Sequence, residues 1–145
     1  MSAPQSFPSA SLAYVIQVGA LTPVAAAPVL FSVEAANLGN VISYGAGIFT
    51  LSAGHTYRCV ANINACTFSG ATGLATFSWR DLTGAALFGV LGVQGTPTSA
   101  AHVAQSGPAT GIITVTQDTT IQLEAITLTA FTSLSNSSAT VEVVG

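Results

Sequence analysis

The sequence predicts an all-β domain, a jelly-roll β-sandwich of about nine or ten short antiparallel strands. Runs rich in Val, Ile, Thr and aromatic residues recur about every 8 to 12 residues, separated by Gly, Asn, Asp and Ser. No segment keeps the hydrophobic period of an amphipathic helix over several turns. No unit recurs at a fixed spacing either, so a solenoid or a propeller is not expected.

The first predicted element is an extended N-terminal arm at residues 1–12, and the jelly-roll domain follows at 13–145. The arm is rich in Ser, Ala and Pro and has no period along which it could bury a face. It lacks the basic residues of a secretory signal, and prolines interrupt the apolar stretch that follows, which disfavours a membrane span. A plain disordered terminus is the alternative. The arm residues that are candidates for docking on a partner are Pro4, Phe7, Pro8 and Leu12.

The strands after the arm are predicted from alternation and from the turns between them. The clearest case is 57–65, where Tyr57, Cys59 and Ala61 share one face and more polar residues share the other. Residues 80–84 end in Gly and predict a hairpin loop. Further turns are expected at 37–40 and 133–138. The predicted strands are 14–18, 29–33, 41–44, 48–51, 57–65, 74–79, 85–93, 112–116, 120–127 and 140–144.

The composition excludes several classes of function. Charged residues make up 5% of the 145 residues, against 50% that are hydrophobic, and the net charge is −3. The two basic residues, Arg58 and Arg80, are too few to neutralise a nucleic-acid backbone. Arg58 and Glu124 are a candidate ion pair, across strands or between subunits. Serines are plentiful, but no nucleophile elbow and no marked carboxylate pair is present, so an enzyme is not expected.

Neither a metal nor another cofactor is expected. His55 and His102 have no ligand spacing that links them to Cys59 or Cys66. On one continuous strand the two cysteines would lie too far apart for a disulfide and on opposite faces, which favours free, partly buried thiols. A turn near 62–64 would leave a disulfide open as the alternative.

Several motifs in the last four fifths of the chain occur in a characteristic order. Pro28-Val-Leu-Phe31 is followed by Ser-Tyr-Gly-Ala-Gly-Ile-Phe-Thr at 43–50, then by Gly54 and Tyr57. A central hairpin at 74–88 and a Gly-Ser-rich approach to paired strands at 107–123 come next. This order resembles the tumour-necrosis-factor-like jelly roll, in the version of the complement-type globular heads. The closing strand at 140–144 departs from that family because it lacks aromatic residues, and the family's acidic calcium loop has no counterpart here.

The resemblance implies a compact homotrimer, in which protomers pack around a threefold axis through one sheet. The composition agrees, since so few charges do not keep the surface of a monomer soluble in the usual way. Aromatic residues in the predicted strands are the candidates for packing at the trimer axis or in the core. Burial in the protomer core is the more common of the two for such residues. They are Phe49, Tyr57, Phe77, Trp79, Phe88 and Phe131.

The sequence therefore predicts a structural protein, a homotrimeric decoration protein that binds and stabilises the exterior of a bacteriophage capsid. The partner would be the major capsid protein or another large assembly, and neither nucleic acid nor a membrane is expected. The protein would be made in the host cytoplasm and reside on the virion. The alternative is a trimeric receptor- or carbohydrate-binding head of a fibre or surface filament. A cytokine-like ligand is a third reading, and it would require export.

Overall fold

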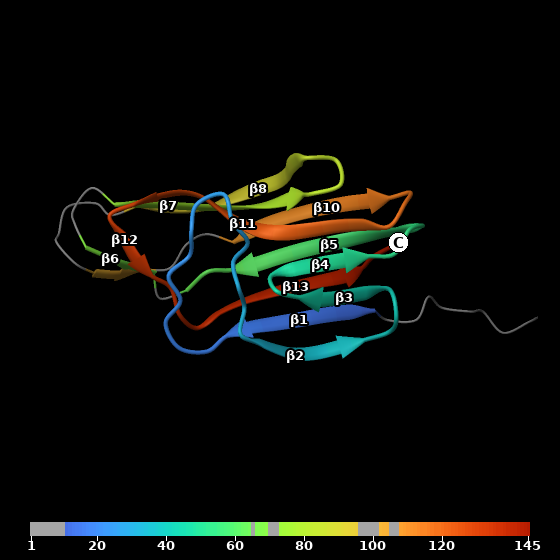
Figure 1. The fold of residues 1–145 in the computed structure, drawn as a ribbon, viewed down its shortest axis with the longest axis horizontal. Coiled ribbons are helices and arrows are strands. Elements are labelled where there is room, and N and C mark those ends of the chain that lie inside the picture. The colour runs from blue at the N-terminus through green and yellow to red at the C-terminus, as the bar shows by residue number, and fades with distance from the viewer. Residues whose placement is uncertain (1–10, 65, 70–72, 96–101, 105–107) are drawn as a thin grey trace, which may run out of the picture.

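A computed structural model describes residues 11–64, 66–69, 73–95, 102–104 and 108–145 and shows an all-β sandwich (Figure 1). Thirteen strands and no helix are present in these ranges, so no helix there is long and apolar enough to cross a membrane. The strands are β1 (Leu12–Gln17), β2 (Val33–Leu38), β3 (Ile42–Gly45), β4 (Ile48–Leu51), β5 (His55–Asn62), β6 (Cys66–Phe68), β7 (Leu74–Asp81), β8 (Ala86–Gly95), β9 (His102–Ala104), β10 (Ala109–Val115), β11 (Thr119–Thr129), β12 (Phe131–Ser133) and β13 (Ser137–Val143).

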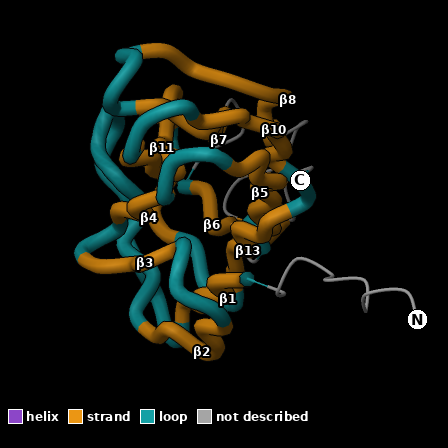
Figure 2. The backbone as a smooth tube through the Cα atoms, turned by 90° about the vertical axis from the view of Figure 1, so that its right-hand side faces the viewer, coloured by secondary structure: helices purple, strands orange, loops and turns teal. Residues whose placement is uncertain are grey.

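Ten of these strands form one continuous hydrogen-bonded ladder that bends into two layers. Its order is β2-β1-β13-β5-β10-β8-β7-β11-β4-β3, and neighbouring strands run antiparallel. Between β10 and β8 the ladder is reduced to a single pair, Thr110 with Val90. Figure 2 shows the result: the first layer holds β10, β5, β13 and β1, and the second holds β7, β11, β4 and β3. A small sheet, β12-β6-β9, lies at one end (Figure 1).

The core fills the space between the two layers with side chains from alternate strand positions. Phe49 and Trp79 from the second layer meet edge to face at 5.7 Å, and both are fully buried. Tyr57 from the first layer is also buried, and its hydroxyl donates to the carbonyl of Ser52 at 2.7 Å. The Trp79 Nε1–H donates to the carbonyl of Ala109 at 3.0 Å, which joins the two layers inside the core.

The layers meet where two glycines allow β8 and β10 to touch. Gly89 has φ +85°, and a Cβ there would lie 2.0 Å from the carbonyl oxygen of Thr110. A Cβ on Gly111 would lie 2.7 Å from the ring of Phe88. Only residues without a Cβ fit this approach, so the two glycines fix the place where the ladder bends.

The predicted fold class is confirmed, with thirteen strands in place of nine or ten because β6, β9 and β12 form an extra sheet. Residues 29–33 do not form the predicted strand. Segment 18–32 instead makes isolated bridges to other strands, among them Pro28 to Glu124, and Pro28 has no N–H to donate to a ladder. The turn predicted at 37–40 begins later, because Asn37 and Leu38 still belong to the edge strand β2.

The arm boundary also differs, since Leu12 is the first residue of β1 and pairs with Glu142 and Leu38. The other three arm candidates, Pro4, Phe7 and Pro8, lie outside the described residues.

Candidate functional site

The outward side of the first layer carries rows of side chains that each run across four to six strands. Residues paired directly across antiparallel strands point to the same side of a sheet. The first row joins Leu38, Leu12, Glu142, Arg58 and Ile112 by such pairs. The row is apolar at both ends and charged only at its centre.

Two further rows lie beside the first and are uncharged. The second runs from β2 to β8 and the third from β2 to β5, again through directly paired residues. We call the three rows together the exposed sheet face. The second row is Ala36, Tyr14, Thr140, Val60, Thr110 and Val90, and the third is Val33, Ile16, Ser138 and Asn62.

Large aliphatic side chains on the exposed sheet face stand in solvent. Val90 is 66% exposed, Ile112 65% and Leu38 56%. Arg58 and Glu142 are the charged residues of the three rows, and they form an ion pair in which Arg58 Nε donates to Glu142 Oε1 at 2.8 Å. The pair leaves the face without net charge. Exposed aliphatic side chains gathered on one face in this way are typical of an interaction site in soluble proteins.

A shallow groove of about 550 Å³ lies on this face where β5, β10 and β8 meet. Its lining includes the two glycines that let the layers touch. Apolar atoms make up most of its walls. The groove is lined by Arg58, Val60, Gly89, Val90, Thr110, Gly111 and Ile112.

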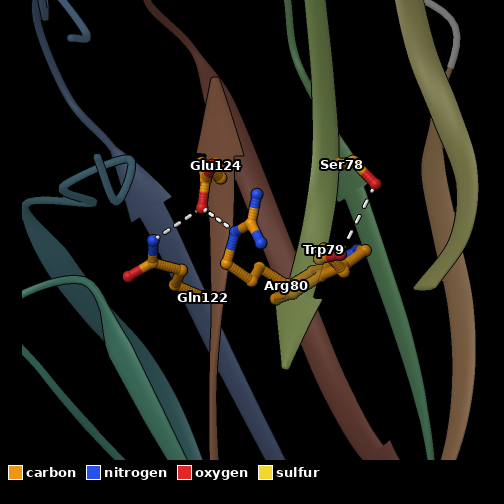
Figure 3. A network of polar contacts seen from close by, with 5 residues as sticks. All are labelled: Ser78, Trp79, Arg80, Gln122 and Glu124. Atoms are coloured by element: carbon orange, nitrogen blue, oxygen red, sulfur yellow. Dashed lines mark hydrogen bonds and ion pairs between the residues drawn. The ribbon is translucent and has the colours of Figure 1, made fainter. Parts of the chain in front are cut away.

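The second layer has a polar outward side, organised around a buried carboxylate (Figure 3). Glu124 is 2% exposed, and its Oε2 accepts from Arg80 Nε at 2.6 Å and from Gln122 Nε2 at 2.9 Å. The hydrogen bond to Glu124 raises the pKa of Arg80. Segment 18–32 pairs along β11 here, through Val29 N–H to the Leu123 carbonyl at 2.8 Å. The network is a structural one, in which each charge has a partner.

The predicted ion pair between Arg58 and Glu124 is wrong. Arg58 pairs with Glu142, its direct partner across β5 and β13, and Arg80 pairs with Glu124. The two arginines lie on different layers, so register decides which carboxylate each one meets.

The six aromatic candidates lie in the core or against it, and none is a member of the three rows. Phe49, Tyr57, Phe77 and Trp79 are fully buried. Phe88 and Phe131 are partly buried and pack on the core cluster. Most residues of the exposed sheet face were not predicted from the sequence, which singled out Leu12, as an arm residue, and Arg58, as one half of an ion pair. A signal was present in β1, where Leu12, Tyr14 and Ile16 on one side are as apolar as Ala13 and Val15 on the other, a pattern typical of strands covered on both faces.

The cysteines and histidines form no site in the described part of the chain. Cys59 and Cys66 are buried in the core, and burial raises the pKa of the Cys59 thiol. The ring of His55 contacts Tyr57 edge to face at 6.0 Å. Across the described ranges, no three His, Cys, Asp or Glu side chains lie close enough together to hold a metal ion.

The sandwich is similar to solved structures of very different sequence. Murine APRIL at pH 5.0 matches it with a TM-score of 0.66 and 13% identity, covering 93% of this chain and 99% of that chain. The globular domain of zebrafish complement 1qA protein matches with a TM-score of 0.64 and 12% identity, covering 92% and 96%. No family sequence model and no curated protein sequence matches the chain. The chain therefore has a TNF-like jelly-roll fold, as its motifs led us to expect.

Proposed function

We propose that the protein is a non-enzymatic structural protein that assembles as a homotrimer through the exposed sheet face. The observation that carries this proposal is the exposed sheet face, where Ile112, Val90 and Leu38 stand exposed among small polar side chains and the charged residues of the rows, Arg58 and Glu142, neutralise each other. A threefold ring uses a contact between two different patches of the same subunit. The part of the face around Tyr14 and the groove beside Ile112 offer two such patches.

We further propose that the trimer decorates the exterior of a bacteriophage capsid and that the arm binds the major capsid protein. Apolar contacts and the arm would hold neighbouring capsid subunits together, because a protein that binds only the assembled capsid favours that state. Support comes from the predicted arm, from the trimer that the family resemblance implies, and from a surface poor in charge, which makes binding insensitive to salt.

The oligomeric state tests the trimer directly. Sedimentation equilibrium of the full chain is expected to give a mass three times the 14.5 kDa of one chain. Ile112→Arg places a charge in the interface and is expected to abolish the trimer. Val24→Arg is the matched control, because Val24 is 66% exposed against 65% for Ile112 and lies in segment 18–32 beside the second layer. A monomeric wild-type protein, or equal effects of the two variants, would refute the proposed interface.

Capsid binding is tested separately, by co-sedimentation of the full chain with undecorated capsids. The decoration role is supported if binding is saturable and the substitution Phe7→Asp weakens it. Binding to a glycan array in the absence of capsid binding would instead favour the receptor- or carbohydrate-binding head.

A further inference from the structure

We infer that the neighbouring subunit covers the Arg58–Glu142 pair as an intact unit, so that assembly requires both charges or neither and is reversed by acid. This control of assembly rests on the trimer interface proposed above. It decides which state of the exposed sheet face a second copy of this chain accepts.

The pair is made within one subunit and still reaches solvent. Arg58 and Glu142 lie directly opposite each other on β5 and β13. Arg58 Nε donates to Glu142 Oε1 at 2.8 Å, and one terminal nitrogen of Arg58 donates to the same oxygen. The two side chains are 55% and 28% exposed. Water therefore still solvates both charges in the free subunit, and a second subunit on this face has to displace that water.

The pair lies inside the proposed contact and not at its margin. Its neighbours along the first row are Leu12 on one side and Ile112 on the other. Arg58 also lines the groove. A surface that reaches from Tyr14 to Ile112 therefore passes over the pair.

A second copy of this chain suits the pair because it brings no competing charge. The same face on a neighbour is neutral and carries a closed pair of its own, so Arg58 and Glu142 each keep the partner they have. The other charged residues of the sequence lie off the three rows, and they are Glu34, Arg80, Asp81, Asp118 and Glu124.

Loss of water makes the two charges depend on each other. A guanidinium does not lose its proton in a protein, so Arg58 stays cationic whatever happens to Glu142. Removing one partner of a covered ion pair leaves the other charge without compensation, which is far more costly than replacing both by apolar side chains of similar size. Assembly is therefore expected to fail with one of the charges and to persist with two or none.

Few titratable groups surround Glu142 on the outward side of the layer. Within the three rows, β5 contributes Arg58 and β1 contributes Tyr14, one row away. The remaining titratable groups of β1, β2, β5 and the end of the chain face the core side or lie beyond the first row, and they are His55, Tyr57, Cys59, Glu34 and the carboxyl group of Gly145.

Acid removes one charge of the pair in the same way as a substitution does. Glutamate side chains in general take up a proton as the pH falls towards about 4, whereas arginine keeps its charge. The assembled state requires the ionised carboxylate of Glu142. The trimer is therefore most stable at neutral pH, and its stability is lost as the pH falls.

Sedimentation equilibrium of full-length variants at neutral pH tests the dependence on both charges. Glu142→Gln is expected to lower the trimer association constant at least about tenfold for each subunit, or about 1000-fold in all. Glu34→Gln removes the same charge from the other side of the layer and is the matched control, expected to change the constant less than about twofold.

The double variant Arg58→Met/Glu142→Leu is expected to restore the constant to within about tenfold of the wild-type value or above it. Wild-type assembly of Glu142→Gln would overturn the inference. A double variant that assembles no better than Glu142→Gln would also overturn it, because the pair would then be needed for its own attraction.

A pH series on the wild-type chain tests the same control without a variant that carries an unpaired charge. From neutral pH to about pH 4 the trimer association constant is expected to fall at least about tenfold, and to recover on neutralisation. The double variant has no carboxylate at this position and is expected to stay within about threefold over the same range. Equal acid sensitivity of the two proteins would overturn the inference.

These measurements separate the control from the interface itself. A wild-type chain that is monomeric at neutral pH refutes the interface, and the control with it. A wild-type trimer that tolerates both Glu142→Gln and acid keeps the interface and refutes the role of the pair.

Discussion

The contact between Gly89 and β10 leads to a sharp prediction about stability. Gly89→Ala introduces a Cβ in a left-handed backbone conformation, 2.0 Å from the Thr110 carbonyl oxygen and 2.6 Å from the Cα of Gly111. The obstructing atoms are backbone atoms, which cannot turn aside as a side chain does. The strand pair that joins the two layers must therefore open, and the free energy of unfolding must fall.

A matched glycine separates the contact from the backbone conformation. Gly54 has φ +89°, close to the +85° of Gly89, but a Cβ there would meet nothing within 4 Å. Gly54→Ala is therefore expected to lower the free energy of unfolding only through the strain of the left-handed conformation. That loss is about 1 kcal/mol, because the smaller entropy of the unfolded chain offsets part of the strain. Gly89→Ala adds the overpacking term of about 1–3 kcal/mol, for a total of about 3 kcal/mol.

Urea unfolding at one fixed protein concentration measures both variants, since association also contributes to apparent stability. We expect the free energy of unfolding of Gly89→Ala to be about 2 kcal/mol lower than that of Gly54→Ala. If the two variants agree within about 0.5 kcal/mol, then the close approach of β8 and β10 does not constrain the fold, and the reasoning fails.

Three further predictions follow from turns, hydrogen bonds and titration. Ala46 and Gly47 both have positive φ in the two-residue turn between β3 and β4, so Ala46→Asn is expected to raise the free energy of unfolding by about 0.5–1 kcal/mol, and a loss of stability in urea would contradict that turn geometry. Trp79→Phe removes the N–H that satisfies the Ala109 carbonyl and is expected to lower stability by about 2–4 kcal/mol, whereas a loss below about 1 kcal/mol would show that water replaces the indole. The raised pKa of Cys59 means that the folded state keeps a proton after the unfolded state has lost it; stability is therefore full below about pH 8.5 and falls above it by at most about 1.4 kcal/mol per pH unit. Cys59→Ala is expected to flatten that fall in unfolding curves recorded on both sides of this pH, and an unchanged slope would assign the effect to other groups.

Local pattern was enough to predict the interior of several strands. The alternation from Tyr57 onward placed Tyr57, Cys59 and Ala61 on one face, and all three are fully buried. The loop at 80–84 was also predicted closely, since β7 ends at Asp81 and β8 begins at Ala86. In both places the preference of the residues and the final packing agree, so short-range information suffices.

The exposed sheet face could not be predicted in the same way, because it is assembled from distant segments. Arg58 and Glu142 meet although 84 residues separate them, and only the register of β5 against β13 brings them together. Alternation shows that a strand has two sides but not which strands lie beside it. For the same reason Val33 was assigned to the strand 29–33 and Leu38 to a turn, although β1 holds both in the edge strand β2.

The close contact of Gly89 with β10 has a consequence for how copies of this chain can add to one another. Within the described ladder only β2 and β3 lack a neighbour on one side, and the chain connects them directly through residues 39–41. Both are short, at six and four residues, and at the opposite flank the single pair of Val90 and Thr110 holds β8 against β10. The end strands of this ladder are therefore short and lie next to each other along the chain, which hinders endless stacking into fibrils and favours assemblies that close on themselves.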